Sequence, residues 1–294
     1  MLDCAYQVIY CWEQFDEIIA EMARSKDEQW LCRGQNNDWP LLTAIERALV
    51  GWRLSLQDAS VVEFQVIREF RRRAREPQYR AVETDTLYCL SLMQHHGAPT
   101  RLLDCTYSPF VAAAFAIENV IFSSTGDPLY PVIWCFNAHW CTNEAKKALP
   151  VSERALIDLR NEDEWRNDQT FVPLFQIKTD KTAPLSKWKF VKVENSFYLN
   201  ERLTAQQGAF LCPADIRSSF ECNLKAMDGW KKAANLKKLY LKFDKEQATR
   251  FARNLKDMNI SFVALFPGLD GFAKSLNQQI CHYDQLGKGK SGHG

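Results

Sequence analysis

The segment from residue 94 to 104 carries the densest set of chemically reactive side chains in the sequence. Two adjacent histidines, an arginine and an aspartate surround a Gly/Pro turn in the run Gln94-His95-His96-Gly97-Ala98-Pro99-Thr100-Arg101-Leu102-Leu103-Asp104. Histidine transfers protons near neutral pH, and a guanidinium binds anionic groups. The pattern predicts a polar site built on a turn. The alternative is that these charged groups only hold the turn together.

We expect no metal at this segment. The other histidines, His139, His282 and His293, are distant in the sequence, and neighbouring side chains at a helix end point in different directions. Cys135 and Cys141 flank His139, but this trio would need further ligands to hold zinc.

Arg33 is the second candidate, because it ends a short apolar strand predicted over 30–33. An isolated charge on a buried strand is costly, so Arg33 either pairs with a carboxylate such as Asp104 or faces a ligand. Its planar fork suits phosphate or carboxylate groups. Gly34 and Gln35 begin the loop that follows the strand. The residues alone leave both readings of Arg33 open.

The third candidate is the segment 202–210, in which Gln206 and Gln207 precede Gly208 and a predicted strand. Two amide side chains at this place predict either a hydrogen-bonding wall or an ordinary loop. A further cluster of arginines over 68–75 is typical of a solvated helix face.

Composition narrows the class of protein. The 294 residues carry 37 Lys and Arg against 36 Asp and Glu, so the molecule as a whole does not attract nucleic acid or anionic lipid. The most apolar stretch, 110–122, is interrupted by Glu118 and Asn119 and is shorter than the ~20 residues that cross a membrane. The first residues do not resemble a secretory signal, and the ten cysteines form no C-x-x-C pair. These features predict a cytoplasmic protein without membrane contact.

Periodicity and capping residues predict the elements that position these candidates. Helices are expected over 12–24, from Asp58 or Ser60, from Thr84 to Gly97, and from Pro109, where Ser108 supplies the N-cap. Strands are expected over 100–104, 131–136 and 208–212. The middle third predicts a helix over 152–165 and strands over 171–177 and 188–199. The last third predicts a strand over 236–243, a helix over 244–258, a strand over 260–266 and a helix after Pro267.

These elements predict an α+β domain whose mixed, strongly bent β-sheet is decorated by helices. No internal repeat and no Pro/Ser linker divides the sequence. We expect an N-terminal helical extension over 1–26, one domain over 27–282 and a disordered tail over 283–294.

The three candidate segments together resemble the FRG domain, a prokaryotic and phage family named for an aromatic-Arg-Gly motif. The resemblance covers roughly residues 27–280 and departs from the family at two positions, where Cys32 replaces the aromatic residue and Cys105 replaces a tryptophan. Both departures change packing and leave the polar groups in place. The matching segments, in order, are Cys32-Arg33-Gly34-Gln35 with Trp39, 94–106, Ser108 with 112–116, Arg202 with 206–210, and 265–271.

A weaker resemblance connects the order of these segments with the ADP-ribosyltransferase fold. In that fold an arginine on the first strand holds the phosphate or ribose of NAD, a Ser/Thr strand supports the nicotinamide pocket, and a late glutamate binds the ribose. The resemblance implies that Arg33 is the anchor, 100–106 the middle strand and Gln207 the late position. The helix start at Ser108 would offer N–H groups to a pyrophosphate.

The implied site has two sets of residues. Catalytic roles fall to Arg33, His96, Asp104 and Gln207; nucleotide-binding roles fall to Arg33, Gly34, Gln35, Gln94, His95, Thr100, Arg101, Thr106 and Ser108. Gln207 departs from the pattern, because a neutral amide supplies only a dipole to the charge that develops at the ribose carbon. Asp104 or Glu201 would have to serve instead of it.

Two functions follow as expectations. One is an ADP-ribosyltransferase-like or NAD-processing intracellular effector, such as a bacterial toxin or a phage-defence protein, that acts on an unknown macromolecular target. The other is a non-catalytic module that senses a nucleotide or binds a protein.

Overall fold

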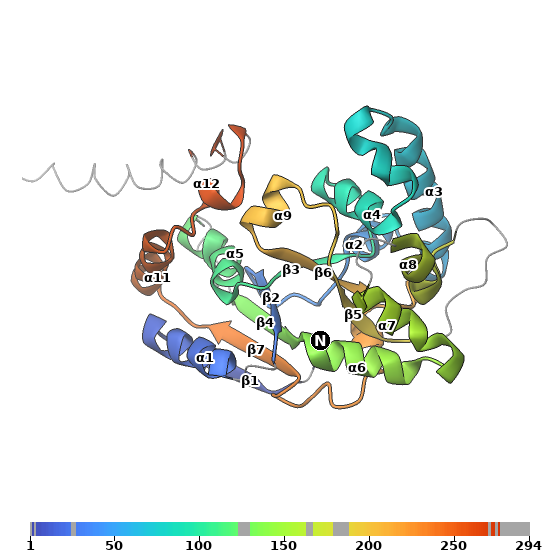
Figure 1. The fold of residues 1–294 in the computed structure, drawn as a ribbon. Helices are drawn as coiled ribbons and strands as arrows, with labels where there is room; N and C mark the ends of the chain where they lie inside the picture. Colours follow the sequence, from blue (N-terminus) through green and yellow to red (C-terminus); the bar gives the residue numbers. More distant parts are fainter. Residues whose placement is uncertain are drawn as a thin grey trace, which may run out of the picture.

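The computed structural model describes residues 2, 4–24, 28–122, 130–162, 167–178, 188–269, 272–273 and 276. At the centre of the fold lies a seven-stranded mixed sheet in the order β1-β7-β4-β2-β3-β6-β5 (Figure 1). The edge strand β1 runs parallel to β7, and every other neighbouring pair is antiparallel. The expected α+β class is therefore confirmed. The strands are β1 Tyr6–Ile9, β2 Trp30–Gln35, β3 Leu103–Thr106, β4 Val132–Asn137, β5 Val191–Glu194, β6 Gly208–Pro213 and β7 Leu236–Leu241.

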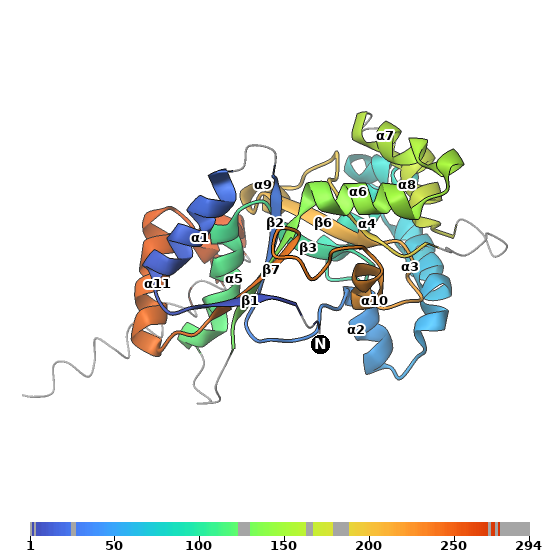
Figure 2. The ribbon, with the colours of Figure 1, turned by 90° about the horizontal axis from the view of Figure 1, so that it is seen from below.

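Helices cover the sheet in two groups (Figures 1 and 2). Helices α1, α5 and α11 gather over the β1-β7-β4-β2 half, whereas α2, α3, α4, α6, α7 and α8 lie around the β3-β6-β5 half. The first group comprises α1 Trp12–Arg24, α5 Pro109–Phe122 and α11 Lys245–Asp257. The other α-helices are α2 Ala44–Gly51, α3 Ala59–Arg73, α4 Thr86–His95, α6 Ala138–Ala148, α7 Ala155–Glu162, α8 Asn167–Phe175, α9 Glu201–Ala205, α10 Phe220–Lys225 and α12 Phe262–Leu265; 3-10 turns cover Leu56–Asp58, Pro77–Glu83 and Val151–Glu153.

The two halves of the sheet meet at a short joint between β2 and β3. Strand β2 pairs with β4 over six residues, but it pairs with β3 only where Cys32 faces Thr106. Strand β3 in turn pairs with β6 along its whole length, from Leu103 to Thr106. The strands that carry the predicted segments are thus neighbours in one sheet, in the order β2-β3-β6.

Helix α5 is held against β2 by an unusually close backbone approach. A Cβ atom at Gly34 would collide with the carbonyl oxygen of Ala112 and lie 2.8 Å from the amide nitrogen of Ala116. The helix starts as the sequence predicts, at Pro109, and Ser108 Oγ accepts a hydrogen bond from the amide of Val111 at 3.3 Å. Because alternate residues of a strand point to opposite faces, Arg33 points away from α5.

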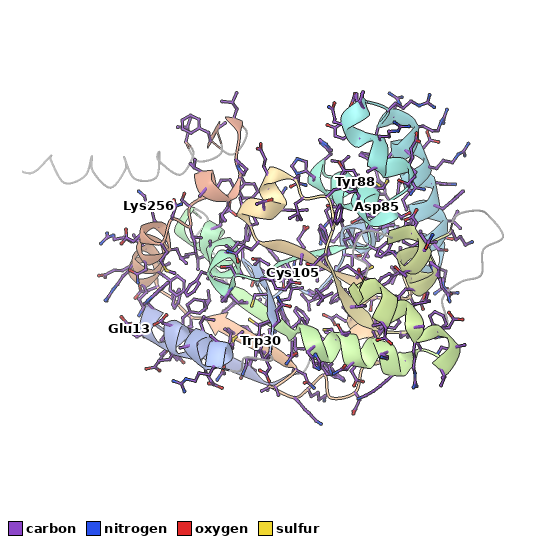
Figure 3. The ribbon with its side chains drawn as sticks, viewed as in Figure 1. Glu13, Trp30, Asp85, Tyr88, Cys105 and Lys256 are labelled. Atoms are coloured by element: carbon purple, nitrogen blue, oxygen red, sulfur yellow. The ribbon has the colours of Figure 1, made fainter. Side chains whose placement is uncertain are left out.

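Two apolar clusters fill the space around the sheet. The smaller one joins β2 and β4 to α1, α5 and α11 through residues such as Cys32, Phe15 and Phe251. The larger one joins α4, α6, α7 and α8 to β3, β5 and β6, and it contains Cys105 near the middle of the molecule (Figure 3). Both clusters include residues of β2 and β4, so these two strands form the wall between them.

The helices predicted over 12–24, from Asp58, from Thr84 and over 244–258 are confirmed, with shifts of one or two residues at their ends. The strand predicted over 100–104 lies at Leu103–Thr106 instead. The sequence analysis did not predict β1 or α2. The predicted tail over 283–294 lies outside the described residues.

Two predicted strands are wrong. Residues 171–177 belong largely to α8, because Phe171, Leu174 and Phe175 are the buried side chains and have helical rather than alternating spacing. Residues 260–266 contain the short helix α12, since Ser261 Oγ accepts a hydrogen bond from the amide of Ala264 and so caps a helical turn.

The close contact at Gly34 generates a stability prediction. Gly34→Ala should lower the free energy of unfolding by at least about 1–3 kcal/mol, because its new methyl group meets backbone that cannot move aside. Gly51→Ala is the matched control: nothing lies within 4 Å of its Cβ position, so it should stabilise by about 0.5 kcal/mol. Urea denaturation of both variants measures the difference. Equal stability of the two variants would contradict the packing described here.

Candidate anion-binding site

The side chain of Arg33 on β2 bonds to β3 next to the place where the backbone pairing of these strands stops. Its Nη1 donates a hydrogen bond of 2.7 Å to the carbonyl oxygen of Asp104. Of the two readings of Arg33, the pairing with the carboxylate of Asp104 is thus not the one seen, because the bond goes to the main chain. Arg33 Nε is buried and has no hydrogen-bond partner in the described part of the chain. The guanidinium thus keeps its charge and a donor for another group.

Arg47 of α2 is a second cation at this place, and the sequence analysis did not single it out. Partial burial lowers the pKa of Arg47, the positive charge of Arg33 lowers it further, and the charge of Asp104 acts in the opposite sense. Arg47 Nη1 donates a hydrogen bond of 2.6 Å to the carbonyl oxygen of Leu42. We call Arg33, Arg47 and Asp104 the arginine site. It holds two positive charges, and the carboxylates of Asp104 and of the neighbouring Glu46 both act to raise the pKa of Arg47.

Arg101 lies elsewhere, enclosed in the protein interior with an exposed fraction of 1%. Its Nε donates a hydrogen bond of 2.6 Å to Glu63 on α3, its Nη2 bonds to the other oxygen of that carboxylate, and its Nη1 donates to the carbonyl of Phe175 at 3.0 Å. Burial acts to lower the pKa of Arg101, but the charge of Glu63 outweighs it and the pKa lies above its ordinary value. In this structure Arg101 ties α3 and α8 to the lead-in of β3, and it does not reach the arginine site.

The two histidines lie at the exposed end of α4, with ring centroids 5.0 Å apart. Partial burial, the neighbouring His96 and the positive charge of Arg202 on α9 lower the pKa of His95. The lowered pKa favours the neutral form of His95, which can accept a proton. Arg202 lies on α9, the helix that leads directly to β6.

Five other predicted residues have contacts that shape the backbone. Gln94 Oε1 accepts a hydrogen bond from the hydroxyl of Thr100, and Gln35 Oε1 accepts one of 3.0 Å from the indole of Trp134. The hydroxyl of Thr106 donates to the carbonyl of Gln206 at 2.6 Å and accepts from the amide of Ser108 at 2.9 Å. Four of these residues hold the turn and the strand ends, while Gln35 fastens β2 to β4. Ser108 caps α5.

Gln207 is exposed at the start of β6, next to the end of β3. It adopts the left-handed conformation with φ 47°, and its carbonyl oxygen accepts a hydrogen bond of 3.0 Å from the amide of Tyr107. Its neighbour Gln206 is buried and donates from Nε2 to the carbonyl of Leu265 at 3.0 Å. Of the two predicted amides, only Gln207 presents its side chain to solvent.

Burial disfavours the thiolate form of three cysteines. Burial raises the pKa of Cys105, of Cys89 to about 11 and of Cys141 to about 12. Within the described residues, no group of three or more His, Cys, Asp or Glu side chains is arranged to hold a metal ion. None of the described helices has the length and apolar character needed to cross a membrane.

The fold and this site define an α+β domain with a positively charged site at the joint of its sheet. Residues 28–123, which contain β2, α2, β3 and α5, match the model of the FRG domain family. This part of the chain is therefore similar to the FRG domain, as the motifs at 32–35 and 94–106 predict, whereas the predicted segments 202–210 and 265–271 lie outside the match. No curated protein and no solved structure matches the chain.

Because Arg33 and Arg101 have different surroundings, their replacement by alanine should lower the free energy of unfolding by different amounts. Arg101→Ala should lower the free energy of unfolding by about 3–5 kcal/mol, because it leaves the carboxylate of Glu63 buried without a counter-charge. Arg33→Ala should cost only about 1–3 kcal/mol, since it removes a hydrogen bond to a carbonyl and strands no charge. Chemical denaturation of both variants checks the difference, and a larger loss for Arg33→Ala would make Arg33 the structural residue.

The pKa of His95 is a second measurable property of the site. Arg202→Gln removes one of the positive charges that disfavour protonation, so the pKa of His95 should rise toward 6.5. NMR titration of the histidine ring protons measures this shift. Arg53→Gln, which removes a charge from the α2 loop, is the control and should leave His95 unchanged. An unchanged pKa in Arg202→Gln would mean that burial and His96 alone set it.

Proposed function

We propose that the chain is an ADP-ribosyltransferase-like enzyme that binds NAD at the joint between β2 and β3. The observation that carries the proposal is the adjacency of β2, β3 and β6, because β2 carries Arg33, β3 carries Asp104, and Gln207 directly precedes β6. The resemblance to ADP-ribosyltransferases rests on the order of these three segments along the chain, and their adjacency in one sheet supports the proposal. The two cations of the arginine site supply an anchor for the phosphates of NAD.

The reaction breaks the bond between nicotinamide and C1′ of its ribose. Nicotinamide leaves as a neutral molecule, and a nucleophile from water or from a target attacks C1′ and loses a proton. Positive charge develops on the ribose, so a nearby carboxylate accelerates the step. In this chain Asp104 is exposed beside Arg33 and is our candidate for that charge, while Gln207 offers a dipole. His95, whose pKa is lowered, and the adjacent His96 are the candidates for accepting the proton.

The biological role that fits this chemistry is that of an intracellular effector, a toxin or a phage-defence protein that modifies an unidentified macromolecule. Growth of bacteria that express the wild-type chain, compared with bacteria that express Arg33→Lys, tests this role. Equal growth would contradict it.

A non-catalytic nucleotide sensor is the second candidate function. Gln207 favours it, because the exposed side chain at the late position of β6 carries no charge to stabilise the ribose cation. A sensor would bind NAD or a related nucleotide and release no nicotinamide.

Incubation of the purified full chain with labelled NAD, with and without cell lysate, tests the enzyme. We expect nicotinamide release and a labelled product. Arg33→Lys keeps the charge but loses the planar fork, so NAD binding should weaken by about 1–3 kcal/mol while the melting temperature changes little. Binding of NAD without any nicotinamide release by the folded wild-type chain would replace the enzyme with the sensor.

A substitution at position 207 tests the proposal through a gain of activity rather than a loss. Gln207→Glu introduces a carboxylate where the ribose cation is expected, and nicotinamide release should increase by about tenfold or more. Gln206→Glu is the matched variant, but its side chain is buried against Leu265, so it should not raise the rate. A Gln207→Glu variant that binds NAD with unchanged turnover would remove position 207 from the site.

A further inference from the structure

Two cysteines face each other across neighbouring strands beneath helix α5. Cys32 of β2 and Cys135 of β4 are register partners in the antiparallel ladder, and both have free, fully buried thiols. The thiol of Cys32 donates a hydrogen bond of 2.9 Å to Sγ of Cys135. The sulfur atoms of two residues that are 103 positions apart in the sequence are thus in direct contact.

The backbone at this pair has the geometry that a disulfide requires. Directly opposite residues of antiparallel strands have Cα atoms about 4.5 or 5.5 Å apart, and disulfides join residues whose Cα atoms are about 4.4–6.8 Å apart. Both kinds of opposite pair fall within that range. A small approach of the two sulfur atoms therefore closes a bond between β2 and β4 without a change in strand register.

Helix α5 covers the cysteine pair (Figure 1). Cys32 points to the same face of β2 as Gly34, since alternate residues of a strand share a face, and Gly34 lies against the backbone of Ala112 and Ala116 on α5. Cys32 and Cys135 pack with these two alanines in one apolar cluster. An oxidant can therefore reach the sulfur atoms only when α5 moves away from β2.

The closed structure protects the reduced form of the pair. Burial raises the pKa of Cys32 well above its ordinary value, and the neighbouring Cys135 raises it further. The thiolate is the reactive form of a cysteine, so the buried pair reacts slowly. When α5 opens, both thiols regain contact with water and the thiolate forms more readily.

We propose that Cys32 and Cys135 are an oxidation site, at which hydrogen peroxide forms a cross-strand disulfide that locks β2 to β4 and a thiol reductant reopens it. One thiolate attacks a peroxide oxygen, so that an S–O bond forms, the O–O bond breaks and the leaving hydroxide takes up a proton to become water. The second thiol displaces the hydroxyl group from the oxidised sulfur, the S–S bond forms and a second water leaves. The pair loses two electrons and two protons, and peroxide is reduced to two molecules of water.

The disulfide would have two effects on the chain. Cys32 directly precedes Arg33, and it is the residue of β2 that pairs with Thr106 at the joint, so the bond would hold the strand of Arg33 to β4 even when α5 opens. A cross-link between residues 103 positions apart also restricts the unfolded chain, which should make the oxidised form the more stable one. No nucleotide takes part, so the test of this site is independent of the proposed function.

Peptide mapping of the full chain after treatment with hydrogen peroxide tests the site. The remaining thiols are alkylated under denaturing conditions, and digestion followed by mass spectrometry identifies the cross-linked peptides. We expect a peptide that joins Cys32 to Cys135 and that disappears after treatment with dithiothreitol. The oxidised chain should melt about 5 °C or more above the reduced chain. Absence of this cross-link in a folded chain whose exposed Cys222 has been oxidised would overturn the proposal.

Two alanine variants separate this pair from the other thiols. Cys135→Ala removes one partner, so it should abolish both the cross-link and the rise in melting temperature. Cys105→Ala is the matched control and should keep both, because Cys105 is also buried but points to the face of β3 opposite to that of Thr106, the partner of Cys32. An equal rise in melting temperature in Cys135→Ala, or loss of the cross-link in folded Cys105→Ala, would contradict the assignment.

Gly34→Ala tests whether α5 controls access to the pair. Its methyl group meets the backbone of α5, so the helix should open more often and the cross-link should form about threefold or more faster than in wild type. Gly51→Ala is the matched control and should react at the wild-type rate. If Gly34→Ala does not fold, wild-type chain in urea below its unfolding transition provides the same comparison. A rate that does not rise under either condition would overturn the role of α5.

Discussion

The arrangement of the molecule depends on the joint at which one residue pair, Cys32 with Thr106, connects two halves of a sheet. Beyond this pair the backbones no longer bond to each other, and the guanidinium of Arg33 takes over by reaching the carbonyl of Asp104. A charged side chain in the place of a ladder hydrogen bond keeps the strands together and leaves unused donors between them. The same interaction therefore closes the fold and creates the candidate site.

Two other contacts keep this joint in place from either side. On one face of the sheet, α5 lies against the backbone of Gly34, and this contact fixes the distance between α5 and β2. On the other side, the buried pair of Arg101 and Glu63 fixes the segment that leads into β3. A buried ion pair costs desolvation energy and contributes little net stability, but the loss of one member is expensive. The pair of Arg101 and Glu63 therefore serves to fix the course of the chain before β3 more than to add net stability.

The sequence predicted the strand of Arg33, the N-cap at Ser108 and the strand after Gln207, because each depends on local signals: an apolar run, a Ser-Pro helix start and a glycine before a strand. It could not separate Arg33 from Arg101, since the difference lies in Glu63, which stands 38 residues before Arg101. It also missed Arg47, whose importance comes from a long-range bond between Ile45 and Thr100. The wrong strands at 171–177 and 260–266 arose where short apolar runs suit either a strand or a helical turn.

The contact between Gly34 and α5 has a consequence for how this chain can vary. The atoms that a new side chain at position 34 would meet belong to the main chain of Ala112 and Ala116. A clash with a side chain can be relieved by a smaller residue at the partner position, but main-chain atoms are the same for every residue type. A second-site suppressor of a substitution at Gly34 would therefore have to move the whole helix, and with it the strand-to-helix turn at Ser108. Position 34 is closed to compensation by any single neighbouring residue.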